Sequence, residues 1–102
     1  MLNPTVATIT LPSPTATSFR LRYLVAGLPV AELVVAAFYN NAGSYIQPLQ
    51  GLNALVPEAN QGGAMTLIAF AINIGGESLA TASPTDVSVV LPPRAPLTVV
   101  VS

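Results

Sequence analysis

The chain lacks the side chains on which most protein chemistry depends. It contains no histidine, cysteine, tryptophan or lysine, and its charged residues are three arginines and four acids. General acid–base catalysis, nucleophilic catalysis and metal ligation draw mainly on the missing residue types. The composition therefore argues against an enzyme, and we expect no catalytic, cofactor-binding or metal-binding residues.

The few carboxylates do not form a recognisable site in the sequence. Glu32, Glu58, Glu77 and Asp86 lie on separate segments, and none lies in a calcium-loop pattern. A catalytic carboxylate pair or a calcium site would need at least two of them to converge. We expect solvated carboxylates on loops and strand faces instead.

Charge is scarce over the chain as a whole. Charged residues make up 7% of the sequence and the net charge is −1, whereas soluble domains usually carry about 25% charged residues. Copies of such a chain repel each other little. Two interpretations stay open: a neutral surface of Thr, Ser, Asn and Gln, or a surface partly covered by copies or partners. We favour the covered surface, because exposed apolar area usually marks an interface.

Several partners and locations are disfavoured. Three arginines cannot form the basic stripe that phosphate binding needs, so we expect no nucleic-acid partner. The longest apolar stretch, residues 24–39, is interrupted by glycine, proline and glutamate, so we expect no membrane span. The first residues lack a signal-peptide pattern. If Met1 is the native start, we expect synthesis in the cytoplasm without a signal peptide and a place in a virion or other extracellular assembly.

The hydrophobic pattern has a period of two. Apolar and polar residues alternate at 7–11, 18–25 and 86–89, which is typical of half-buried strands. Turn residues separate these runs, and ten prolines suit an all-β domain better than a helical one. We predict an all-β fold, a single antiparallel β-sandwich of about seven strands over residues 1–91. Eight residues are predicted to lie buried between its sheets: Phe19, Leu21, Tyr23, Leu67, Ala69, Ala71, Val87 and Val89.

One segment is ambiguous in the sequence. Residues 29–39 (PVAELVVAAFY) begin with the proline and glutamate of a helix start, but their β-branched and aromatic residues favour a strand. Both flanking segments also read as strands. We predict a strand here.

Three segments resemble a known family. Residues 17–23 (TSFRLRY) resemble the second strand of a fibronectin type III domain, with Tyr23 in place of the core tryptophan. Residues 67–78 (LIAFAINIGGES) resemble the sixth strand and the following loop, and residues 84–91 resemble the last strand. The chain departs from the family at Met65, which stands where the corner tyrosine is expected. The resemblance implies an immunoglobulin-like sandwich that serves as a binding, spacing or structural module.

The C-terminal end differs from the rest of the chain. Residues 92–96 (PPRAP) form a stiff spacer, and residues 97–102 (LTVVVS) form a β-prone extension. This extension could be an added edge strand of the same domain, the start of a further domain, or a strand lent to a neighbouring subunit. The proline-rich spacer favours exchange. The candidate interaction residues here are Leu97, Val99, Val100 and Val101.

A second candidate surface is the pair Tyr39 and Tyr45, which flank a turn and are predicted to be exposed. Exposed aromatic rings can stack on sugars, although the lack of tryptophan disfavours a carbohydrate site. Two function classes therefore stay open. The first is a structural subunit or decoration protein of a large assembly, such as a virion, phage tail or surface filament, that binds copies of itself or other subunits. The alternative is an adhesive or carbohydrate-binding module of a larger secreted protein.

Overall fold

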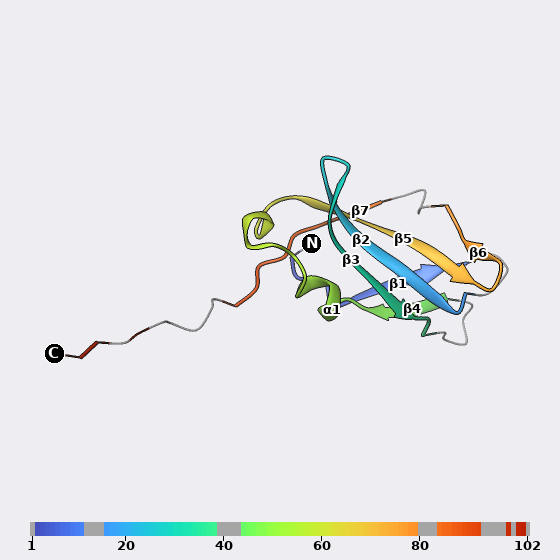
Figure 1. Cartoon of the computed structure of the whole chain (residues 1–102), viewed down its shortest axis with the longest axis horizontal. Helices are drawn as coiled ribbons and strands as arrows, with labels where there is room; N and C mark the ends of the chain where they lie inside the picture. Colours follow the sequence, from blue (N-terminus) through green and yellow to red (C-terminus); the bar gives the residue numbers. More distant parts are fainter. Residues whose placement is uncertain are drawn as a thin grey trace.

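The computed structural model describes residues 2–11, 16–38, 44–79, 84–92, 98, 100 and 101. This part of the chain is mostly β-structure in two antiparallel sheets (Figure 1), which confirms the prediction of an all-β fold. The strands are β1 (Val6–Thr10), β2 (Ser18–Val25), β3 (Leu28–Ala36), β4 (Ser44–Pro48), β5 (Met65–Asn73), β6 (Gly76–Glu77) and β7 (Thr85–Val87). A short helix, α1 (Gln50–Asn53), and a 3₁₀ turn, η1 (Glu58–Asn60), connect β4 to β5. The sequence analysis did not anticipate these two helical turns.

The larger sheet is built around β2. Its strand order is β3-β2-β5-β6, and β7 also pairs with β5. A tight turn at Ala26 and Gly27 joins β2 to β3, with φ values of 50° and 81°. Positive φ at both central residues matches the twist of a two-residue hairpin. Because β3 covers most of residues 29–39, the strand prediction for that segment is confirmed.

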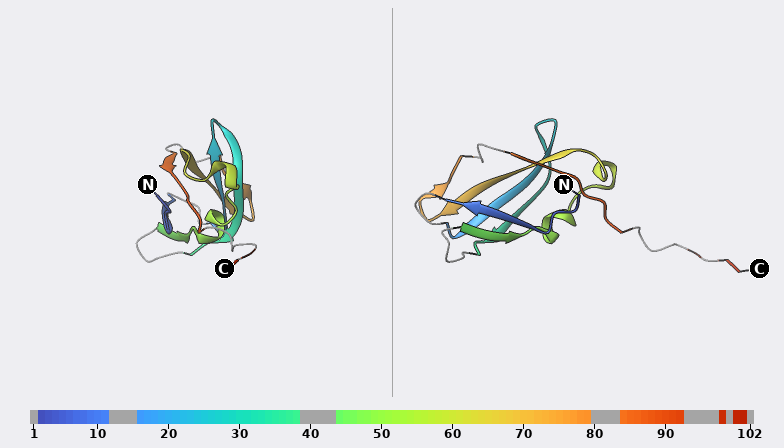
Figure 2. Two further views of the ribbon diagram at one scale, coloured as in Figure 1. Left: turned by 90° about the vertical axis from the view of Figure 1, so that its left-hand side faces the viewer. Right: turned by 180° about the vertical axis from the view of Figure 1, so that it is seen from behind.

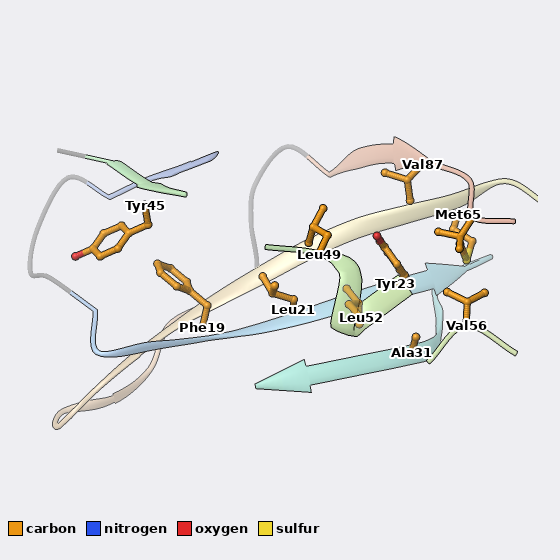
Figure 3. Close-up of a cluster of buried hydrophobic side chains, with 11 residues drawn as sticks. Phe19, Leu21, Tyr23, Ala31, Tyr45, Leu49, Leu52, Val56, Met65 and Val87 are labelled. Atoms are coloured by element: carbon orange, nitrogen blue, oxygen red, sulfur yellow. The ribbon is translucent and has the colours of Figure 1, made fainter. Parts of the chain in front are cut away.

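The smaller sheet consists of β1 and β4, which pair antiparallel from Val6 opposite Pro48 to Thr10 opposite Ser44. Its inner side meets the inner side of β2. The ring of Tyr45 packs edge-on against the ring of Phe19, with 5.0 Å between the ring centroids (Figure 3). Side chains from both sheets therefore share one core.

Five of the eight predicted core residues are buried: Phe19, Leu21, Tyr23, Val87 and Val89. The other three, Leu67, Ala69 and Ala71, pack against this core but are only partly buried. All three lie on β5, and the two strands of the smaller sheet do not cover the larger sheet completely. The connection after β4 closes one end of the core with Leu49, Leu52 and Val56 (Figure 3).

A buried polar link holds the start of β1 in place. The Tyr23 hydroxyl donates a hydrogen bond to Asn53 Oδ1 (2.5 Å), and Asn53 Nδ2 donates to the backbone oxygen of Pro4 (2.8 Å). Burial raises the pKa of Tyr23 to about 12, because the charged form would lose its hydration. The link joins β2, α1 and the segment before β1.

Asn3 connects the segment before β1 to the segment after β7. Its backbone N–H donates to the oxygen of Ser88 (2.7 Å), and its side-chain amide exchanges two hydrogen bonds with the backbone of Val90 (2.8 and 3.1 Å). Asn3 has a φ of 47°, in the left-handed region that asparagine tolerates better than most residues. The chain turns here into β1. As a result β1 runs back along the sheets, whereas the chain after β7 leaves in the opposite direction (Figures 1 and 2).

One detail differs from the fibronectin type III resemblance. That resemblance assigns residues 17–23 and 67–78 to the second and sixth strands, which lie in opposite sheets of an immunoglobulin-like sandwich. In this structure β2 and β5 pair directly, with Ser18 opposite Ile72 and Leu24 opposite Thr66. The two strands are therefore neighbours in one sheet, and family membership stays a prediction.

Candidate interaction surface

The structure changes the role expected for the tyrosine pair. The side chain of Tyr45 is only 2% exposed. Its hydroxyl accepts a hydrogen bond from the backbone N–H of Ala16 (3.1 Å), and its ring contacts Phe19. The prediction that Tyr45 is exposed is wrong, because alternation along β4 turns Tyr45 and Gln47 toward the core. Tyr39 lies outside the described residues.

The C-terminal candidates are partly described. Val100 and Val101 are 88% and 89% exposed, which is nearly the exposure of free side chains. They lie well away from the two sheets (Figures 1 and 2). Leu97 and Val99 lie outside the described residues. The described valines therefore make little contact with the rest of their own chain.

An unpaired strand edge is the second feature of this surface. Within the described ranges, β4 is the only strand that pairs with β1. Leu49 N donates to the oxygen of Thr5 (2.9 Å), so the backbone groups of Thr5 are directed toward β4. Because the direction of these groups alternates along a strand, those of every second residue after Thr5 are also directed toward β4. Those of Val6, Thr8 and Thr10 are directed away from β4. An open edge of this kind is a template for another strand.

An apolar groove lies beside this open edge. It consists of two hollows of about 170 and 210 Å³, both lined by Ile9, Thr10 and Ala69. The first hollow also reaches Leu21 and Leu67, and the second reaches Phe19. The groove is thus the place where the smaller sheet leaves the inner face of β5 uncovered. We call the open edge of β1 together with these two hollows the β1 groove.

The edges of β3 and β4 are better protected. β3 is also an edge strand, but it carries Pro29 and the charged Glu32, two features that discourage strand addition. The outer edge of β4 is occupied by the chain after β3. There Ile46 N donates to the oxygen of Phe38 (2.9 Å), and the Gln47 side chain is bonded to the backbone of Ala36 and Phe38. The β1 edge lacks such protection.

The outer face of the larger sheet carries a connected group of charges. Arg20 binds Glu32 through Nη1 (3.0 Å) and Glu77 through Nε (2.9 Å). Arg22 Nε also donates to Glu32 (2.6 Å), and its guanidinium lies 4.9 Å from the centre of the Phe70 ring. Hydrogen bonds from Arg22 and Arg20 hold the pKa of Glu32 below its ordinary value, although desolvation opposes them.

This group was not anticipated by the sequence analysis, which expected the acids to lie apart. The structure brings Glu32 and Glu77 to the same arginine, because β3 and the β5–β6 hairpin flank β2. Hydrogen bonds to Glu77 and then to Glu32 raise the pKa of Arg20. Glu32 and Glu77 therefore each form an ion pair with an arginine.

The described part of the chain contains no cluster of three or more acid, histidine or cysteine side chains that could hold a metal ion. None of its helices has the length and apolar character needed to cross a membrane.

Comparisons with family models, with curated proteins and with solved structures find no match for this chain.

Proposed function

We propose that this chain is a non-catalytic structural or interaction module, a subunit or decoration protein of a large assembly such as a virion, phage tail or surface filament. Its two sheets form a β-sandwich of the immunoglobulin-like kind, with a strand-forming extension after residue 91. It contacts copies of itself or other subunits through sheet edges and apolar surface.

The observation that carries this proposal is the exposure of Val100 and Val101 at 88% and 89%. Burial of each valine side chain is worth roughly 1.5–3 kcal/mol. A terminal segment of mostly apolar residues therefore gains stability when another surface covers it. Its backbone groups also need partners once water is excluded.

The distribution of charge supports the same function. Four of the seven charged residues neutralise each other on the outer face of the larger sheet. Large apolar side chains are exposed elsewhere, including Ile74 and Leu79 near β6. With little repulsion between copies, such a surface is compatible with dense packing into an assembly.

The test is removal of the C-terminal segment. We expect the full chain to form a multi-copy species, measured by light scattering after size exclusion, and a chain lacking residues 97–102 to stay folded but monomeric. A matched variant replaces residues 97–102 by Gly and Ser, which keeps the length but removes the apolar side chains. If both variants assemble as well as the parent, the proposal fails.

The carbohydrate-binding alternative has lost its main support. It depended on an exposed pair of tyrosines, and one member of that pair, Tyr45, is buried in the core. No other observation in the described residues favours it, so we put forward no second function.

A further inference from the structure

We propose that the β1 groove accepts the C-terminal segment of a second copy of this chain. In this arrangement residues 97–101 of one copy pair along the open edge of β1 in the next. The inference rests on the proposed function, self-association, and adds to it the site at which the segment binds.

The open edge supplies the hydrogen-bonding groups. Val6, Thr8 and Thr10 direct their N–H and C=O groups away from β4, and no other described strand pairs with them. An added strand would satisfy these groups and extend the two-stranded sheet to three. Main-chain hydrogen bonds of this kind provide affinity, while pockets for alternate side chains provide specificity.

The segment and the groove match in length and pattern. β1 has five residues, and residues 97–101 also number five, so each spans about 17 Å when extended. Alternation would place Leu97, Val99 and Val101 on one face of the added strand. The groove offers apolar walls to that face, from Ile9 and Leu67 among others. Thr98 and Val100 would then face outward, as Thr8 does.

The geometry favours a second copy over the chain's own C-terminal segment. The hydrogen bonds between Asn3 and Val90 fix the point at which the chain leaves the sheets. From that point β1 runs in one direction and the chain after β7 runs in the other (Figure 1). To reach its own groove the segment would have to reverse within residues 92–96, a stiff stretch that contains three prolines. The same spacer can bridge roughly 15 Å to a neighbour.

The donor and acceptor surfaces are different parts of one chain, so the contact is heterologous. Repeated head-to-tail, it gives a ring if the rotation closes and an open filament if it does not. A reciprocal exchange between two copies would give a closed dimer instead. The mass of the assembled species separates these outcomes.

Cysteine cross-linking tests the placement directly, because the chain has no cysteine of its own. One chain carries Val100→Cys and a second chain, distinguished by a mass tag, carries Val6→Cys, Thr8→Cys or Thr10→Cys. Neighbouring strands bring facing Cβ atoms to within about 5.5 Å. For at least one of the three β1 positions, we expect the yield of mixed disulfide to be about tenfold or more above that of a control chain with Val34→Cys. The reason is the high effective concentration of the two cysteines when the segment is bound beside β1.

Val34 is a suitable control because it lies on the outer face of the larger sheet and is 49% exposed, close to the 54% of Val6. If all three β1 positions cross-link no better than Val34→Cys, the placement in the β1 groove is wrong.

Substitutions in the donor segment test its orientation. Val99→Asp would bury a charge in the groove, whereas Thr98→Asp would leave the same charge in solvent. We expect the association constant to fall about 100-fold for Val99→Asp and less than about threefold for Thr98→Asp. Equal effects of the two variants would contradict the proposed orientation. Because all the described strands lie within residues 6–87, these variants leave the core residues unchanged.

Substitution of the acceptor edge separates the inference from the proposed function. Thr8→Pro removes an outward N–H while leaving the bonds between β1 and β4 intact, and Thr8→Val keeps that N–H. We expect Thr8→Pro to weaken association about tenfold or more and Thr8→Val to leave it unchanged, with circular dichroism showing that both fold. If removal of residues 97–102 abolishes assembly but Thr8→Pro does not affect it, the groove is wrong and self-association stands. If the parent chain stays monomeric, both fail.

Discussion

β2 and the C-terminal segment both consist of strand-forming residues but have opposite environments. Both alternate or cluster apolar residues in a way that favours a strand. In β2, hydrogen-bonded to β3 on one side and β5 on the other, Phe19, Leu21 and Tyr23 have no exposed surface. In the C-terminal segment Val100 and Val101 remain almost fully exposed. Strand propensity alone does not produce a strand; a paired backbone and a covered face are also required.

β1 and β2 also differ in how completely their faces and edges are covered. β2 is covered on its inner face by the smaller sheet and on its outer face by the paired charges around Arg20. β1 has one paired edge and one open edge. Among the described residues, β1 thus has an open edge that lacks the proline and charge of β3, and the strand-prone C-terminal segment has no described strand beside it.

Hydrogen exchange should show the largest difference between the two regions. We expect the amides of residues 19–23 to exchange at least about 1,000-fold more slowly than those of Val100 and Val101 in dilute solution, because they open only with the whole fold. Mass spectrometry of peptides from each region measures this ratio. On concentration into the assembled form, the C-terminal amides should gain protection. If they stay unprotected in the assembly, they are not paired in it.

A matched pair of truncations should sharpen the comparison. Leu21→Ala removes a fully buried side chain, and we expect it to lower the free energy of unfolding by about 2–5 kcal/mol. Val100→Ala removes an exposed one and should change it by less than about 0.5 kcal/mol. Urea titration at a concentration that keeps the chain monomeric provides both values. Similar losses for the two variants would mean that the C-terminal segment packs on its own chain.

Alkaline pH should weaken the buried end of β2. Burial raises the pKa of Tyr23 from 10.0 to about 12. A raised pKa means that the stabilisation from neutral Tyr23 is complete below pH 10 and is lost as the pH rises from 10 to 12. We expect a loss of about 1–3 kcal/mol across that range in the free energy of unfolding.

Tyr23→Phe is the control for this effect. At neutral pH it should be less stable by about 1–2 kcal/mol, since Asn53 Oδ1 loses its donor. Between pH 10 and 12 it should lose less stability than the parent, because the variant lacks the buried Tyr23 hydroxyl that ionises in that range. An identical alkaline profile in parent and variant would show that Tyr23 is not the titrating group.

The outer face of β2 should give the smallest effect. Glu32→Gln removes the carboxylate that binds Arg22 and Arg20, and we expect a loss of less than about 1 kcal/mol at low salt. Because the pKa of Glu32 is lowered in the folded state, its contribution to stability is fully present above pH 4.5. This contribution is lost as the pH falls through the pKa that Glu32 has in the folded state. High salt should reduce the difference between parent and variant. A difference that is unchanged in high salt would point to packing rather than charge.

Much of the fold could be predicted from periodicity. The alternation at residues 18–25 correctly predicted β2 and its three buried side chains. Because side chains alternate between the two faces of a strand, the apolar residues share one face, and that face must be the covered one. The exposure of Tyr45 was predicted wrongly, since β4 is short and its neighbours in the sequence are turn residues. The helical turns between β4 and β5 were also missed, because four residues show no helical period.

Only one of the two parts of the candidate site could be recognised in the sequence. Its donor half, residues 97–101, could be recognised as a strand-prone run after a proline-rich spacer. Its acceptor half could not, because the open edge of β1 depends on which strands pair with it. The convergence of Glu32 and Glu77 on Arg20 likewise required the order of β3, β2 and β5–β6 in the sheet.

The sequence by itself determined the all-β class of the fold. Its alternation selects strands, because the side-chain period of a strand is a local property of the backbone. Only the tertiary structure decided that β1 keeps an open edge, that Tyr45 is buried and that β5 is incompletely covered. These properties depend on pairings between residues far apart in the chain, which local patterns do not encode.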